Sequence, residues 1–144
     1  MNNKKYFFFI TFILLLSIVF NFYQANKLKN YDKRIVYLDH KFSESLLKIS
    51  ESLENNNKNH TTTYALAYQY ASFSNALAEY TSYAKKTDQV HSYSSILVTR
   101  LQQALISKKP LKKENEIAQS LKKLSSNPID PEELNRLSYL LTYD

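Results

Sequence analysis

The chain contains no glycine, no cysteine and no tryptophan among its 144 residues, and only three prolines. Tight hairpins, phosphate-binding loops and left-handed helix caps depend on glycine, so its absence excludes the Walker A and dinucleotide-binding fingerprints. The absence of cysteine excludes disulfides, a thiol nucleophile, a thiolate metal site and a lipid-modified cysteine anchor. These gaps favour helices joined by short loops of Asn, Ser and Lys.

One long hydrophobic run is present. Residues 6–23, YFFFITFILLLSIVFNFY, carry no charge and follow a short tail that ends in two lysines. As a helix the run would be roughly 27 Å long, close to the ~30 Å hydrocarbon core of a bilayer. Its Phe, Ile, Leu and Val side chains favour insertion by about 4–8 kcal/mol, a figure that the polar residues Thr11, Ser17 and Asn21 reduce.

A cleaved secretory signal and a buried helix of a soluble protein are the two alternatives to a permanent anchor. The run is longer than the usual h-region of a signal peptide. Its exit also lacks a small-x-small cleavage site, because Tyr23 would occupy the −3 position for cleavage after Ala25. We therefore predict a tail at residues 1–5 and an uncleaved, single-pass transmembrane anchor at residues 6–23.

The orientation of the anchor follows from the basic residues on its two flanks. The lysines of the tail favour an internal N-terminus, whereas four basic residues between positions 27 and 34 favour the reverse. A five-residue tail before a signal-like segment is usually held inside while the rest is translocated. We therefore expect the C-terminal domain on the extracytoplasmic side of the cell membrane. The composition is similar to that of small membrane proteins from low-GC Gram-positive bacteria, a similarity that assigns no residue a role.

Residues 24–144 are predicted to form one all-α domain, an antiparallel bundle of about four to five helices. The first helix, 27–54, carries an apolar stripe through Leu28, Ile35, Phe42 and Ile49, and no helix breaker separates it from the anchor. The anchor and this helix can therefore form one long rod. The remaining helices are predicted at about 61–86, 89–107 and 111–124, and from Pro131 onwards.

The predicted helix 61–86 has two apolar faces. One face carries Leu66, Tyr70, Phe73, Leu77, Tyr80 and Ala84. The other carries Tyr64, Ala67, Tyr68, Ala71 and Ala78. Two apolar faces are typical of a helix that is buried on both sides, so we expect this helix at the centre of the bundle, with its alanines allowing close approach of a neighbour.

No residue pattern in the sequence indicates catalysis or metal binding. His40, His60 and His91 lie in three different segments, and none has a second ligand at metal-binding spacing. The acidic residues of the first helix alternate with lysines as on a solvated face, and a serine nucleophile elbow would need glycine. We therefore expect no catalytic residue, no metal, no cofactor and no enzymatic activity.

Tyrosines and lysines are the two candidates for an interaction surface. Tyrosines cluster in the second and third helices, where they fit either a core or a protein contact. Lysines concentrate around the fourth helix, where they form either a solvated surface or a contact for anionic lipid, an anionic wall polymer or an acidic protein. The candidate surface consists of Tyr64, Tyr68, Tyr83, Lys108, Lys109, Lys112 and Lys113. Nucleic acid is not an expected partner, because no recognised binding motif is present.

The leading functional hypothesis is a membrane-anchored helical protein that binds another protein, as a scaffold, sensor or regulator of a membrane or envelope process. The alternative is a ligand-binding module with a tyrosine-lined apolar pocket for a lipid or small molecule. A hydrolase with an unrecognised site is the weakest hypothesis. A filled core with an exposed apolar stripe would favour the first hypothesis, and a closed aromatic cavity would favour the second.

Overall fold

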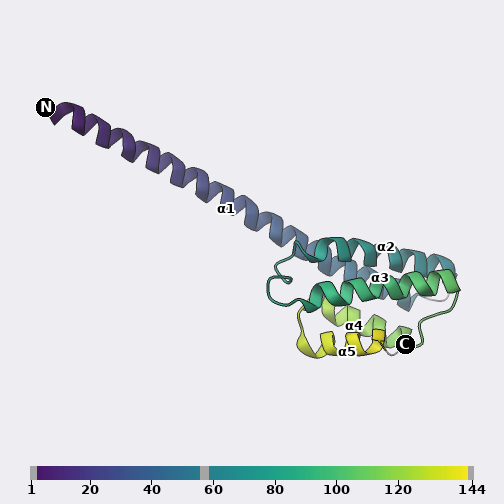
Figure 1. The fold of residues 1–144 in the computed structure, drawn as a ribbon. Helices are drawn as coiled ribbons and strands as arrows, with labels where there is room; N and C mark the ends of the chain where they lie inside the picture. Colours follow the sequence, from purple (N-terminus) through teal and green to yellow (C-terminus); the bar gives the residue numbers. More distant parts are fainter. Residues whose placement is uncertain (1–2, 56–58, 143–144) are drawn as a thin grey trace. The chain divides into compact units, whose positions relative to one another are not determined.

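The computed structural model describes residues 3–55 and 59–142, and every regular element in those ranges is an α-helix. The helices are α1 (Asn3–Glu54), α2 (His60–Ala78), α3 (Gln89–Ser107), α4 (Glu114–Ser126) and α5 (Pro131–Thr142), as Figure 1 shows. The predicted all-α fold with a long, apolar first helix is confirmed. Part of the polar loop expected at residues 55–60 lies outside the described residues. The chain forms two compact units, Met1–Arg34 and Ile35–Asp144.

The first unit consists of the N-terminal part of α1. Its apolar side chains are all exposed, from 49% for Ile13 to 76% for Phe8. Among the described residues, α1 is the one helix that is long and apolar enough to cross a membrane. The helix is unbroken from the apolar run to Glu54, and no proline or glycine interrupts it. α1 therefore contains both the predicted anchor segment and the first predicted helix of the bundle.

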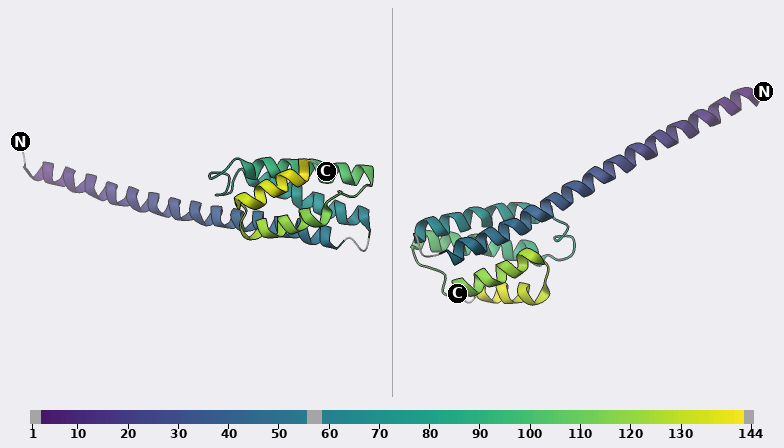
Figure 2. Two further views of the ribbon diagram at one scale, coloured as in Figure 1. Left: turned by 90° about the horizontal axis from the view of Figure 1, so that it is seen from below. Right: turned by 180° about the vertical axis from the view of Figure 1, so that it is seen from behind.

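The second unit is a helical bundle. In it, α2 packs against α3, α4 packs against α5, and α3 also contacts α5. The views in Figures 1 and 2 agree that the α4–α5 hairpin covers one side of the layer formed by α2, α3 and the C-terminal part of α1. The Ser50 hydroxyl of α1 donates a hydrogen bond to the Ala118 carbonyl of α4 at 2.8 Å. This buried bond ties the hairpin to α1.

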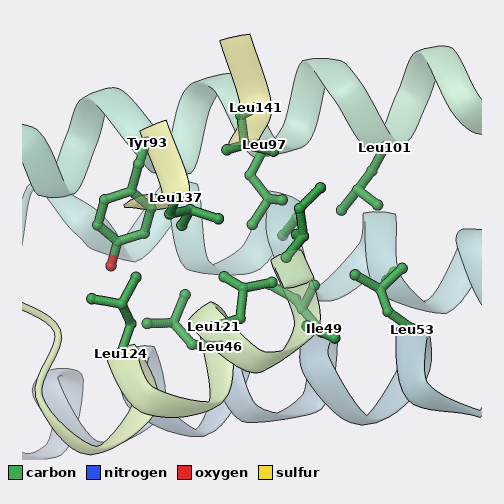
Figure 3. Close-up of a cluster of buried hydrophobic side chains, with 14 of the residues drawn as sticks. Leu46, Ile49, Leu53, Tyr93, Leu97, Leu101, Leu121, Leu124, Leu137 and Leu141 are labelled. Atoms are coloured by element: carbon green, nitrogen blue, oxygen red, sulfur yellow. The ribbon is translucent and has the colours of Figure 1, made fainter. Parts of the chain in front are cut away.

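Leucines from four helices fill the space between these elements (Figure 3). The α1 stripe enters the core through Phe42, Leu46, Ile49 and Leu53, all fully buried. Each such side chain stabilises the fold by about 1.5–3 kcal/mol relative to exposure. The other helices contribute Leu97 and Leu101 (α3), Leu121 and Leu124 (α4), and Leu137 and Leu141 (α5). These leucines form the inward faces of α3, α4 and α5.

The start of α5 matches its sequence signal. Asp130 Oδ1 accepts hydrogen bonds from the backbone N–H groups of Glu132 and Glu133, at 3.0 and 3.1 Å. Pro131 occupies the first helical position, where a missing N–H costs no hydrogen bond. The Glu133 carboxylate is buried, accepts a hydrogen bond from Ser120 Oγ at 2.7 Å and pairs with Lys123. Burial alone would raise the pKa of Glu133, but the hydrogen bonds from Lys123 and Ser120 outweigh it and hold that pKa below its usual range.

Two predicted helix ends are wrong, each because a side chain captures a backbone group. The second helix was expected to continue to about residue 86, but α2 ends at Ala78. Beyond it, Asp39 accepts hydrogen bonds from the backbone N–H and the hydroxyl of Ser82, at 2.7 and 2.6 Å. The fourth helix was expected from residue 111, but the Leu111 N–H donates to the Tyr64 hydroxyl at 2.8 Å, and α4 begins three residues later.

The absence of glycine has a local cost at the end of α3. Lys108 caps this helix with φ 55° and ψ 27°, the left-handed conformation that glycine usually supplies. It is the one residue with positive φ in the described ranges. A side chain with a Cβ is destabilised there by about 1 kcal/mol or more.

We predict that Lys108→Gly raises the free energy of unfolding of the full-length chain by about 1 kcal/mol, because glycine adopts this conformation without steric strain. Chemical denaturation in detergent micelles would measure the change. Lys109→Gly is the matched control, since Lys109 does not have a positive φ, and it should leave stability unchanged or lower it. Equal effects of the two substitutions would contradict the assignment of strain to Lys108.

Candidate interaction surface

One face of α2 is completely buried. Tyr64, Ala67, Ala71 and Ala78 have no exposed surface, and Ser74 between them is also buried. Alanine side chains let two helix backbones approach closely, and this face supplies three of them. α2 packs against α3, and a face of small residues suits close packing of helices.

The opposite apolar face of α2 is exposed. Leu66, Phe73 and Tyr80 expose 44%, 47% and 62% of their surface. Tyr70 and Leu77, which lie between them, are half-buried. Steps of four, three, four and three residues align all five on one side of the helix and its C-terminal turn, and this set is called the α2 stripe. The prediction that α2 is buried on both sides is therefore wrong: its neighbours cover the alanine face completely and the α2 stripe only in part.

A groove opens beside the N-terminal end of the α2 stripe. It has a volume of about 440 Å³. Leu66 and Tyr70 form its apolar part, and Lys48 and Glu51 of α1, which pair at 2.7 Å, lie on its polar side. Several lining residues are exposed, so the groove is open to solvent. It is not the closed aromatic cavity that a ligand-binding module would require.

The three tyrosines predicted to form a surface lie in or against the core. Tyr64 is fully buried; its ring stacks on that of His60, with ring centroids 4.3 Å apart, and its hydroxyl accepts the Leu111 N–H. Tyr68 and Tyr83 are half-buried and pack against the core, with the Tyr83 ring 6.1 Å from that of Phe42. A surface role for Tyr64 is therefore wrong, and these three tyrosines do not make a common exposed patch.

The predicted lysines lie in the connection between α3 and α4; Lys112 and Lys113, expected within the fourth helix, precede α4. Lys108, Lys109 and Lys112 are exposed, whereas Lys113 is partly covered and holds its Nζ 5.0 Å from the centre of the Tyr139 ring. Lys109 and Lys112 line one shallow hollow of about 160 Å³ together with Arg100. The structure thus brings part of the basic group together.

Two lysines of α4, the helix around which the sequence concentrates lysines, form ion pairs with glutamates. Lys122 pairs with Glu54 at 3.6 Å, and Lys123 pairs with the buried Glu133. The exposed lysines of the predicted candidate surface are Lys108, Lys109 and Lys112, all in the α3–α4 connection.

Glu114 and Tyr93 are buried ionisable groups. Burial raises the pKa of Glu114, at the start of α4, while a hydrogen bond from the Tyr64 hydroxyl lowers it. Burial also raises the pKa of Tyr93, far above that of a free phenol, and its ring lies among the core leucines (Figure 3). Within residues 3–55 and 59–142, no group of three or more histidine, aspartate or glutamate side chains is placed to hold a metal ion.

Comparison of the chain with protein-family models, with curated proteins and with solved structures finds no match.

Two alanine substitutions compare the burial of a core side chain with that of a side chain on the α2 stripe. We predict that Leu97→Ala, in the core, lowers the free energy of unfolding by about 2–5 kcal/mol. Phe73→Ala, on the α2 stripe, should cost less than about 1 kcal/mol, because half of that side chain is already in water. Chemical denaturation of the two full-length variants gives both values. A loss for Phe73→Ala as large as that for Leu97→Ala would show that the stripe is core.

Proposed function

We propose that the chain is a single-pass membrane protein whose helical bundle binds another protein through the α2 stripe. The observation that carries this proposal is that α2 fills the core with one face and still exposes large apolar side chains on the other. An aligned set of exposed apolar residues on a helix is typical of a surface that another helix or chain covers. A scaffold, sensor or regulator of a membrane or envelope process would use such a surface.

The exposed area of the α2 stripe is small for a stable protein–protein interface. An aromatic side chain presents about 150–250 Å², so the exposed parts of Phe73 and Tyr80 together offer roughly 200 Å². A standard stable interface takes about 800 Å² from each partner, several times more. Such a contact is weak in free solution. It becomes effective when both proteins are held in the same membrane, because anchoring raises their effective concentration.

The surroundings of the stripe fit an amphipathic helix as the bound element. The adjoining groove gives this helix a polar rim made by Lys48, Glu51 and Ser52, next to the apolar contact on Leu66 and Tyr70. Desolvated aromatic side chains carry more binding energy than rim charges. In this proposal the α2 stripe provides the affinity, and the exposed lysines of the α3–α4 connection adjust it by long-range attraction.

The anchor and its orientation form the first part of the proposal, and both are open to test. We predict that the chain stays with membranes after alkaline extraction. The chain has no cysteine, so Gln102→Cys, at an exposed position of α3, introduces a unique label site. An impermeant maleimide should label it in intact cells if the bundle is extracytoplasmic. Labelling only after lysis would invert the topology, and release of the chain by alkali would contradict the anchor.

The second part concerns the α2 stripe. A photoreactive residue at Gln69, exposed and about 40° from Phe73 around α2, should cross-link a partner in membranes, and one at Gln102 should not. We predict that Phe73→Ser with Tyr80→Ser lowers this capture at least tenfold, since loss of two aromatic anchors costs more than about 2 kcal/mol.

Replacement of Lys108, Lys109, Lys112 and Lys113 by Gln is the comparison. It should reduce capture less than the double serine variant and make it less sensitive to salt. Capture that is unchanged in the serine variant and lost in the glutamine variant would assign the binding to charge and contradict the role of the stripe.

A further inference from the structure

On one face of α1, polar residues lie in or directly after the apolar run, and large apolar residues lie in the charged segment that follows. Ser17, Asn21, Gln24 and Leu28 follow one another in steps of four and three residues. At about 100° per residue they fall within an arc of about 60°, and Tyr31 extends the same line. The first three are polar and lie in or directly after the apolar run. Leu28 and Tyr31 are large and apolar, lie in the charged segment that follows, and are 64% and 51% exposed.

Each half of this face is unfavourable in its own surroundings. A polar side chain in hydrocarbon costs free energy unless it makes a hydrogen bond. An exposed leucine or tyrosine in water forgoes the free energy of burial. A second helix packed along this face would remove both unfavourable exposures. It would supply hydrogen-bond partners in the membrane and cover the apolar side chains outside it.

Thr11, another polar residue of the apolar run, makes its hydrogen bond within α1. The Thr11 hydroxyl donates to the Phe7 carbonyl at 2.9 Å, so its hydrogen bond stays within α1. Thr11 also lies about 120° from Ser17 around the helix, away from the face in question. No such bond to the described residues is made by Ser17 or Asn21. Polar side chains in transmembrane helices commonly bond across to a neighbouring helix.

We propose that a second copy of this chain packs in parallel against this face of α1, which is called the α1 seam (Ser17, Asn21, Gln24, Leu28 and Tyr31). The proposal rests on the membrane insertion proposed above and is independent of the α2 stripe. The alternating steps of four and three residues match the contact line of two left-handed supercoiled helices.

The chemistry of the seam favours a second copy over a different protein. An amide side chain is both a donor and an acceptor, so it can pair with an identical amide. Two copies inserted in the same direction bring Asn21 to the same depth in the bilayer, and likewise Gln24. A different membrane protein would need polar residues at matching depths. A dimer would also carry two α2 stripes, which strengthens the binding of a partner that has two contact sites.

Disulfide cross-linking in native membranes tests the geometry. Single cysteines are introduced into the full-length chain at seam positions (Gln24→Cys, Leu28→Cys) and at a control position, Asn26→Cys, about 160° from both around α1. On mild oxidation, the two seam variants should form disulfide dimers at least tenfold faster than the control. Equal rates at all three positions, or faster dimerisation at Asn26, would overturn the proposal.

The strength of self-association tests the chemistry. Labelled full-length chains in liposomes should show dimers by energy transfer, and Asn21→Leu should weaken the dimer by about 3- to 30-fold. Thr11→Val, whose hydroxyl bonds within its own helix, should leave it unchanged. No energy transfer from chains that still resist alkaline extraction, or equal strength with Asn21→Leu, would refute the seam but leave the anchor intact. Chains released by alkali would refute the anchor instead.

Discussion

The close packing of α2 on its alanine face is the contact on which the rest of the bundle depends. Ala67, Ala71 and Ala78 have no exposed surface and take up little volume, so α2 and α3 can lie close together. Most large side chains of the core then come from the other helices, as leucines of α1, α3, α4 and α5, while α2 adds Tyr64. Leu66, Phe73 and Tyr80 of the α2 stripe remain exposed outside that core. The α2 stripe therefore lies on the side of the helix that this packing leaves exposed, where it is available for the proposed contact.

A chain without glycine must form its corners by other means, and here side chains do so. Asp39 holds the turn after α2, the Tyr64 hydroxyl holds the segment before α4, and Asp130 caps α5. Asp39 and Tyr64 accept hydrogen bonds from backbone N–H groups in the connections, and Asp130 accepts them from the first turn of α5. Lys108 accepts the left-handed conformation instead. These corners explain how helices of 12–19 residues can pack as a bundle on α1 without tight glycine turns.

The hydrophobic periodicity predicted which segments are helical, but not every helix end or which apolar faces are buried. The bounds 89–107 of α3 and the start of α5 at Pro131 agree with the sequence signals. At α5 the signal is local, because Asp130 caps the helix and Pro131 occupies its first position. The end of α2 and the start of α4 depend on Asp39 and Tyr64, which are distant in the sequence, and no local pattern reveals such partners. Likewise a period shows that a face is apolar but not that a neighbour covers it. The alanines on one face of α2 were the signal that could have separated the buried face from the exposed one.

The central claim is that α2 buries its alanine and Tyr64 face and presents Phe73 and Tyr80 to a partner. Hydroxyl-radical footprinting of the purified full-length chain in lipid nanodiscs measures the oxidation rate of each aromatic side chain directly. We expect Phe73 and Tyr80 to be oxidised at least tenfold faster than Tyr64 and Tyr93, after correction for the intrinsic reactivity of each residue type. Equal protection of Phe73 and Tyr64 would mean that both faces of α2 are buried in the bundle, and the proposed binding surface would not exist.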